Sequence, residues 1–299
     1  MGISREQALD CLRSDDLVGI GMEADAVRRR LHPEGVVSYV VGGRVDCAGP
    51  AGAMECAIGD AIELGATGVR VAGMGGMGIA AMEMERLEAW LRGARRRFPA
   101  IWMEGLTAEV ARLAKRCGLA VGEAVARLQS AGLDSIAGDG VGLVCEDGDA
   151  GAWIAVHRAA LGLGMRTTAE MTFGGGETIE QRVDLLEAVR GLQEETGGFA
   201  AFVPVAAEAP GGRELDGVTA VERLKTLAVS RMFLDNVENV QASAAGEGLK
   251  VLQMGLRFGA NDVGAVGAGA SEEDLRRIIR DAGFRPVERD GVYRAMMLN

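Results

Sequence analysis

The stretch MRTTAEMTFGGG, residues 165–176, decides the fold class of this chain. An apolar and β-branched run ends there in three glycines. The next segment, residues 177–196, repeats apolar residues every three to four positions, which predicts a helix. A second strand-like run, FAAFVP, follows at residues 199–204. A strand, a helix and another strand in succession favour two parallel strands joined by a helical crossover.

The same alternation extends in both directions from this unit. Strand-like runs begin near Val36, Val69, Ile101, Ser135, Arg166, Phe199, Asn239 and Asp262. Eight such runs separated by amphipathic segments predict an α/β chain, a (βα)₈ TIM-like barrel. We expect one domain over residues 1–299, with a helical preamble (1–31), the barrel (32–268) and a C-terminal helix and hairpin (269–299). Ser271 is the predicted N-cap of that helix, with a Glu near its third position, and the Asp-Gly pair in VERDGVYRAM predicts the hairpin turn.

Composition and charge exclude several classes of protein. The chain has 299 residues, of which 48% are hydrophobic and 25% charged, and a net charge of −11. That charge and an aromatic content of 4% disfavour binding to nucleic acid. The sequence lacks a secretion signal and any run of about 18 apolar residues, so we expect a cytoplasmic protein that does not enter a membrane.

Acidic residues follow or end several predicted strands, where barrel enzymes carry their active sites. These candidate catalytic residues are Glu104, Asp139, Glu170 and Glu208. Arg44 and Asp46 follow the first strand. Carboxylates on neighbouring strands can bind Mg²⁺ or Mn²⁺, for which Glu104 and Glu170 are the candidates. The alternative is structural: the glutamates lie at strand ends and pair with an arginine such as Arg70 or Arg166, and Asp139 is a turn residue.

A second set of residues suits a polar ligand. Asn239, Gln241 and Ser243 alternate along the seventh strand, Asn261 and Asp262 lie at the start of the eighth, and Gly75 and Gly76 follow the second. The polar residues could instead tie strand ends to neighbouring loops, and the glycines could serve loop geometry alone. The chain has only two histidines, His32 and His157, both next to or inside helical segments, so histidine-based hydrolysis and zinc sites are disfavoured.

Residues 165–176, the segment ETIEQRVDLLEAVRGLQEETGGFAAFVP and the later runs DNVENVQAS and LRFGANDVG together resemble one family. It is the radical SAM family of menaquinone biosynthesis, which contains the cyclic dehypoxanthinyl futalosine, aminofutalosine and FO synthases. The resemblance implies a radical SAM type of barrel. It also implies a [4Fe–4S] cluster on a CxxxCxxC motif and a glycine pair, here Gly75 and Gly76, that contacts SAM.

The cluster motif of that family is absent from this chain. Its five cysteines, Cys11, Cys47, Cys56, Cys117 and Cys145, are too far apart in sequence to form the CxxxCxxC spacing. The loop GGRVDCAGPAGAMEC after the first strand leads almost directly into a helix, so the cysteine-bearing segment is deleted rather than mutated. We therefore expect no [4Fe–4S] cluster and five cysteines that are small buried hydrophobic residues.

The sequence resembles the family more closely in its scaffold than in the residues of the predicted pocket. Glu104, Asp139, Glu170 and Glu208 all lie where this sequence departs from the family pattern, and Glu177 ends a segment in which a family histidine is lost. Two functions follow. The first is a non-radical relative that binds a nucleoside-like ligand or serves as partner or regulatory subunit of an active paralogue. The second is a repurposed enzyme that uses the acquired carboxylates. SAM and a divalent metal are the possible cofactors.

Overall fold

The computed structural model describes residues 2–46, 51–72, 83–137, 141–142, 150–207, 218–242, 248–267 and 269–296. The helices are α1 (Arg5–Arg13), α2 (Leu17–Leu31), α3 (Ala51–Glu63), α4 (Met84–Arg97), α5 (Thr107–Cys117), α6 (Val121–Ala131), α7 (Ala150–Gly162), α8 (Ile179–Thr196), α9 (Ala220–Phe233), α10 (Gly248–Gly255) and α11 (Glu272–Asp281). The strands are β1 (Val36–Val40), β2 (Gly42–Asp46), β3 (Gly68–Ala72), β4 (Trp102–Gly105), β5 (Val141–Gly142), β6 (Thr167–Phe173), β7 (Phe199–Ala206), β8 (Asn239–Val240), β9 (Asp262–Ala265) and β10 (Arg285–Glu288).

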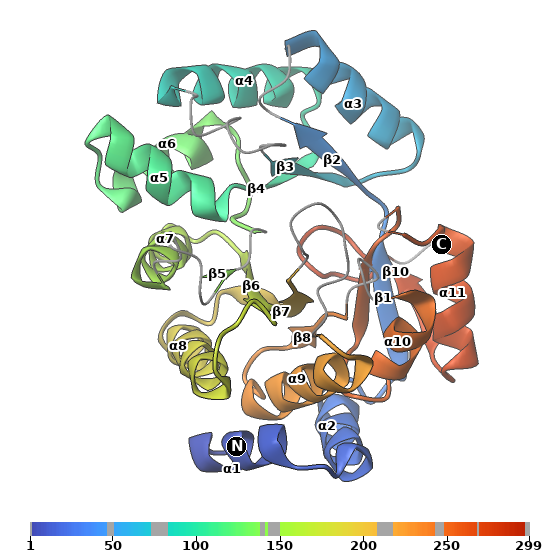
Figure 1. Cartoon of the computed structure of the whole chain (residues 1–299). Helices are drawn as coiled ribbons and strands as arrows, with labels where there is room; N and C mark the ends of the chain where they lie inside the picture. Colours follow the sequence, from blue (N-terminus) through green and yellow to red (C-terminus); the bar gives the residue numbers. More distant parts are fainter. Residues whose placement is uncertain are drawn as a thin grey trace.

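The strands pair in parallel and lie inside a ring of helices (Figure 1). Three sheets have the orders β10-β1-β9, β2-β3-β4 and β5-β6-β7-β8. Single parallel bridges also join Glu104 of β4 to Ser135, and Gln241, the residue after β8, to Asp262 of β9. The predicted parallel α/β architecture is thus confirmed. Its closure into one eight-stranded barrel is not established by the pairing of the described residues.

Each of the eight predicted strand-like runs contains a strand or a bridge, and two predictions need correction. Residues 42–46, predicted to be a loop, form β2, because they continue the direction of β1 after a break at Val41 and pair with β3. Residues 285–288 form β10, a parallel partner of β1 that sequence reasoning missed because a proline and charged residues hide its pattern.

Local signals set the ends of the C-terminal elements. Ser271 caps α11, as predicted, in a reciprocal capping box whose partner at the third helical position is Asp274 rather than a glutamate. Arg289 and Ala295 form an antiparallel bridge around the Asp290-Gly291 turn, which confirms the hairpin. Residues 289–295 are called the C-terminal hairpin below.

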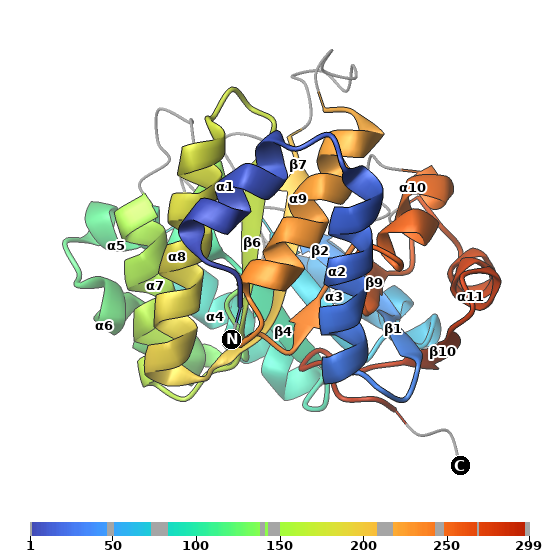
Figure 2. The same cartoon turned by 90° about the horizontal axis from the view of Figure 1, so that it is seen from below.

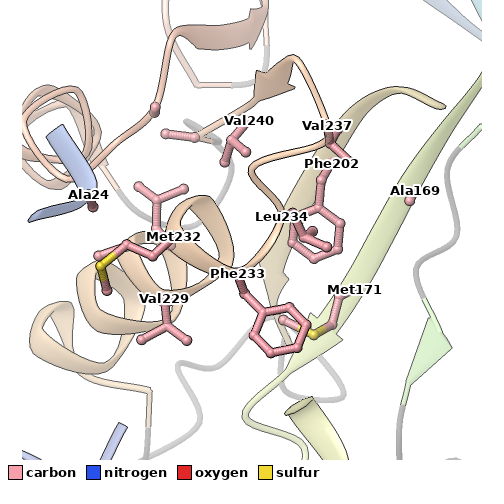
Figure 3. Close-up of a cluster of buried hydrophobic side chains, with 14 of the residues drawn as sticks. Ala24, Ala169, Met171, Phe202, Val229, Met232, Phe233, Leu234, Val237 and Val240 are labelled. Carbon is pink, nitrogen blue, oxygen red and sulfur yellow. The ribbon is translucent and has the colours of Figure 1, made fainter. Parts of the chain in front are cut away.

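Two apolar cores separate the strands from the helices. One gathers side chains from α2, β6, β7, β8 and α9, including Met171, Phe202 and Phe233 (Figure 3). The other packs β2, β3 and β4 against α3 to α6 and includes Val45, Val71 and Met103. Residues that alternate with these along the strands therefore face the inside of the ring.

The two N-terminal helices pack against the outside of the ring. Helix α2 lies along α9, and α1 lies across α8 and α9 (Figure 2). Arg5 of α1 pairs with Glu187 of α8 at 2.6 Å on the exposed surface. Within the described part of the chain, no helix has the length and apolarity needed to cross a membrane.

Candidate functional site

A row of charged side chains crosses the inward faces of three adjacent strands. Arg44 of β2 is the register partner of Arg70 of β3, which in turn is the partner of Glu104 of β4. Their neighbours Val45 and Val71 are buried in the outer core. Because side chains alternate along a strand, Arg44, Arg70 and Glu104 face the interior.

Arg70 joins the two glutamates that sequence reasoning proposed as catalytic residues or metal ligands. Its guanidinium lies 2.9 Å from Glu170 Oε1 and 3.5 Å from Glu104 Oε1. The Glu170 side chain is 7% exposed, whereas that of Arg70 is 36% exposed, so the cluster is reached by solvent from the Arg70 side. In the described residues no group of three or more His, Cys, Asp or Glu side chains is arranged to hold a metal ion. The predicted pairing with Arg70 is therefore found, but in the interior rather than at the strand ends.

The C-terminal hairpin contributes a second polar cluster to the interior. Arg289 forms a bidentate ion pair with Asp262, at 2.5 and 3.1 Å, and both side chains are almost fully buried. Asp262 also accepts hydrogen bonds from Ser38 Oγ at 2.6 Å and from the backbone N–H of Gly264 at 2.8 Å. Burial alone would lower the pKa of Arg289, but the Asp262 carboxylate outweighs it and the pKa is raised.

Tyr293 belongs to the same cluster. Its hydroxyl donates a hydrogen bond to Gln241 Oε1 at 2.8 Å, and the Arg289 guanidinium lies 3.6 Å from its ring centroid. Burial raises the pKa of the Tyr293 hydroxyl. The positive charge of Arg289 opposes this, and the negative charges of Asp262 and Glu104 add to it. The phenol therefore stays protonated and acts as a hydrogen-bond donor at neutral pH.

The hairpin lies at the amino-terminal end of the strands. A Cβ on Gly291 would come within 2.4 Å of the Trp102 ring, so only glycine allows this close contact. Trp102 and Asp262 are the first residues of β4 and β9, and amino-terminal ends of parallel strands lie together. Tyr293 has a backbone φ of 63°, a left-handed conformation that costs a tyrosine roughly 1 kcal/mol or more. The hairpin thus lies against the first residues of β4 and β9.

Two of the predicted ligand residues instead hold strand ends together. Asn261 accepts a hydrogen bond from the fully buried Arg231 at 2.6 Å and donates one to Asn239 Oδ1 at 2.8 Å. Asn239 in turn donates to the carbonyl of Ala200 at 2.9 Å. Arg231 also donates to the backbone carbonyls of Gly259, Val237 and Glu238. The structural alternative raised from the sequence describes these contacts.

Five of the predicted site residues, Gly75, Gly76, Asp139, Glu208 and Ser243, lie outside the described residues. The same holds for Cys47 and Cys145. Among the described cysteines, Cys56 and Cys117 are exposed and Cys11 is half-buried, so the prediction that all were buried is wrong. All three lie on the outer helices α1, α3 and α5, where the helices leave one face to solvent.

Glu177 has a role that sequence reasoning missed. Its carboxylate accepts hydrogen bonds from the backbone N–H groups of Gly174 at 2.7 Å and Gly175 at 2.9 Å, and pairs with Arg182 at 2.6 Å. Burial alone would raise the pKa of Glu177, but these donors outweigh it and lower the pKa. Glu177 therefore fixes the loop that follows β6. The glycine run followed by a glutamate just before a helix N-cap was the available signal.

Known proteins share this architecture. The FeFe-hydrogenase maturase HydG from Carboxydothermus hydrogenoformans superposes with a TM-score of 0.72 at 12% identity, over 98% of this chain and 78% of its own. Methylornithine synthase (PylB) gives a TM-score of 0.69 at 13% identity, over 96% and 94% of the two chains. The chain therefore shares the α/β fold of these two proteins.

Comparison with known sequences shows which family of proteins the chain matches. The family model for the CofH/MqnC C-terminal region matches residues 196–298. Cyclic dehypoxanthine futalosine synthase of Streptomyces coelicolor is 30% identical over 350 residues, which covers 99% of this chain and 86% of that protein. The chain belongs to this radical SAM family of menaquinone biosynthesis.

Replacing Arg70 with methionine tests the interior cluster. We expect the free energy of unfolding to fall by about 2–3 kcal/mol at pH 7.5, because the buried Glu170 and the half-buried Glu104 lose the cation that they share. Chemical denaturation measures this loss. Arg44→Met, on the adjacent strand, is the matched control, with an expected change within about 0.5 kcal/mol. An equal loss in the two variants would contradict the prediction.

Proposed function

We propose that this chain is a cytoplasmic, cluster-free member of its family that performs no radical chemistry and binds a small polar, nucleoside-like ligand inside the ring of strands. The observation that carries the proposal is the set of cysteines that could bind a cluster. The sequence has no CxxxCxxC motif, and the described cysteines Cys11, Cys56 and Cys117 lie on three different outer helices. A [4Fe–4S] cluster needs thiolates that converge on one point, which these residues do not provide.

The alignment with the Streptomyces coelicolor protein supports a deletion. It spans 350 positions, more than the 299 residues of this chain, so segments of the relative have no counterpart here. The parallel bridges at Glu104 and Gln241 support the inference that the strands close into a barrel. Such a barrel, closed at its amino-terminal end by the C-terminal hairpin, would receive a ligand from the carboxyl ends of its strands.

The repurposed metal enzyme is the weaker alternative. Arg70 lies between Glu104 and Glu170, and a guanidinium between two carboxylates occupies the place that a divalent cation would need. A role as non-catalytic partner of an active paralogue has one observation in its favour. Val18 and Met22, one turn apart on α2, are 70% and 67% exposed, as an apolar contact surface would be.

Anaerobic reconstitution with iron and sulfide tests the proposal directly. We expect no stoichiometric iron and no visible cluster absorption, while calorimetry detects binding of a purine nucleoside but no tight binding of Mg²⁺ or Mn²⁺. A stoichiometric cluster would restore radical chemistry and reject the proposal. Tight metal binding that is lost in Glu170→Gln would favour the enzyme. If no ligand binds and the chain co-migrates with a paralogue on gel filtration, the partner role takes its place.

A further inference from the structure

Arg44 differs in its exposure and its ion pairing from the other charged residues that face the interior, which are Arg70, Glu104, Glu170, Asp262 and Arg289. Its side chain is exposed although it lies on the inward face of β2. Gly43 marks the opposite face, because a Cβ there would lie 2.6 Å from Ala61 of α3. In the described part of the chain, the Arg44 guanidinium makes no hydrogen bond and no ion pair. Among the described residues, this inward-facing cation therefore has no counterion.

The acidic residues around Arg44 already have partners. Glu104 and Glu170 share Arg70, and Asp262 holds Arg289. Asp46, the next inward residue of β2, is also engaged. Among the residues that the structure describes, no acid of this cluster is therefore left to neutralise Arg44, and an anionic group of a ligand can supply the counterion.

We propose that Arg44 and Arg70 together form a binding site for one anionic group of a small ligand, a carboxylate or a phosphate. As register partners on adjacent parallel strands, the two residues have Cα atoms about 5 Å apart, so both guanidinium groups can reach the same anion. Guanidinium groups suit this role because their planar donors match the oxygens of carboxylate and phosphate. The carboxylate of Asp46 on the same face limits the site to a single anionic group.

This inference rests on the proposed function in one respect: the anion belongs to the ligand bound inside the ring. It also extends that function, since a nucleoside-like ligand would have to carry an acidic substituent. Such a substituent would bind at the level of Arg44 and Arg70, above the C-terminal hairpin.

Chemical modification of arginine by phenylglyoxal, mapped by mass spectrometry, tests the site with simple probes. Inorganic phosphate and acetate are compared with chloride at equal ionic strength. We expect phosphate, acetate or both to slow modification of Arg44 about fivefold. Arg96, an exposed arginine of helix α4, is the internal control and should be modified at the same rate in all three salts. Protection by only one of the anions identifies the group that the site prefers.

Calorimetry of phosphate binding gives a second, independent readout. We expect affinity to fall about tenfold in Arg44→Gln and to stay unchanged in Arg96→Gln. The anion site would be overturned if Arg44, like Arg96, were modified at the same rate in all three salts, or if the affinity for phosphate were unchanged in Arg44→Gln. These results are distinguishable from failure of the proposed function. A reconstituted iron–sulfur cluster would reject the cluster-free proposal while leaving anion protection at Arg44 intact.

Discussion

Replacing Asp262 with alanine lowers the free energy of unfolding by about 3–5 kcal/mol, the largest effect that we expect from a single substitution. The carboxylate is fully buried and forms two hydrogen bonds with the guanidinium of Arg289, which is itself 5% exposed. Removing it leaves a buried charge uncompensated and leaves the Ser38 hydroxyl and the Gly264 N–H without their acceptor. Urea denaturation monitored by circular dichroism measures the loss.

The control for this prediction is an ion pair on the surface. Arg5 pairs with Glu187 where both side chains are more than a third exposed, so Arg5→Ala should lower the free energy of unfolding far less than Asp262→Ala does. The double variant Asp262→Leu with Arg289→Met removes both charges and should recover part of the loss. A cost below about 1 kcal/mol for Asp262→Ala would mean that the C-terminal hairpin is not anchored by this pair.

Acidification from pH 7 to pH 4 removes about 3 kcal/mol of stability through His157 alone. The imidazole is fully buried between Trp153 and Phe199, with its Nδ1 3.2 Å from Thr167 Oγ1, and burial lowers its pKa to about 3. The unfolded chain takes up a proton near pH 6.5, but the folded chain does not. Stability is therefore complete above pH 6.5 and is lost progressively as pH falls toward 3.

His157→Gln isolates this contribution. The variant has a lower stability at pH 7 because it disturbs the aromatic packing, but its stability should fall with acid by about 3 kcal/mol less than that of the unsubstituted chain. His32→Gln serves as the control, since His32 lies outside the aromatic cluster and bonds to the carbonyl of Glu238. Denaturation curves at pH 7, 5.5 and 4 measure how the free energy of unfolding of each variant depends on pH. Parallel acid dependence in His157→Gln and the unsubstituted chain would exclude His157 as the source.

The sequence predicted the parallel strands well because their signal is local. Apolar runs such as residues 199–204 are buried on both faces in β7, and they stand out from the amphipathic helices around them. Strands β2 and β10 escaped prediction for the opposite reason. Gly42 and Gly43 read as a turn, and Arg285 with Pro286 reads as a loop, yet both segments are fixed by pairing with β3 and β1. Their conformation depends on partners distant in the sequence.

For the site, the sequence predicted some of the residues but not how they are arranged in space. The sequence left two alternatives open for Glu104 and Glu170: catalytic or metal-binding residues in a pocket, or strand-end residues paired with an arginine such as Arg70. That Arg70 reaches Glu170, which lies on a strand not adjacent to its own, follows from the curvature of the sheets and not from sequence spacing. The insertion of Tyr293 beside Gln241 likewise had no local signal, since a short Asp-Gly hairpin reads as a surface turn.

The C-terminal hairpin also sets an order of events during synthesis. Residues 289–293 leave the ribosome after every strand that they contact, so the strand ends that they contact stay uncovered until these residues have emerged. Asp262 carries an unpaired charge throughout that interval, and water or a chaperone must solvate it. A nascent or prematurely terminated chain that lacks Arg289 is therefore a target for quality control, even when every helix and strand before it has formed.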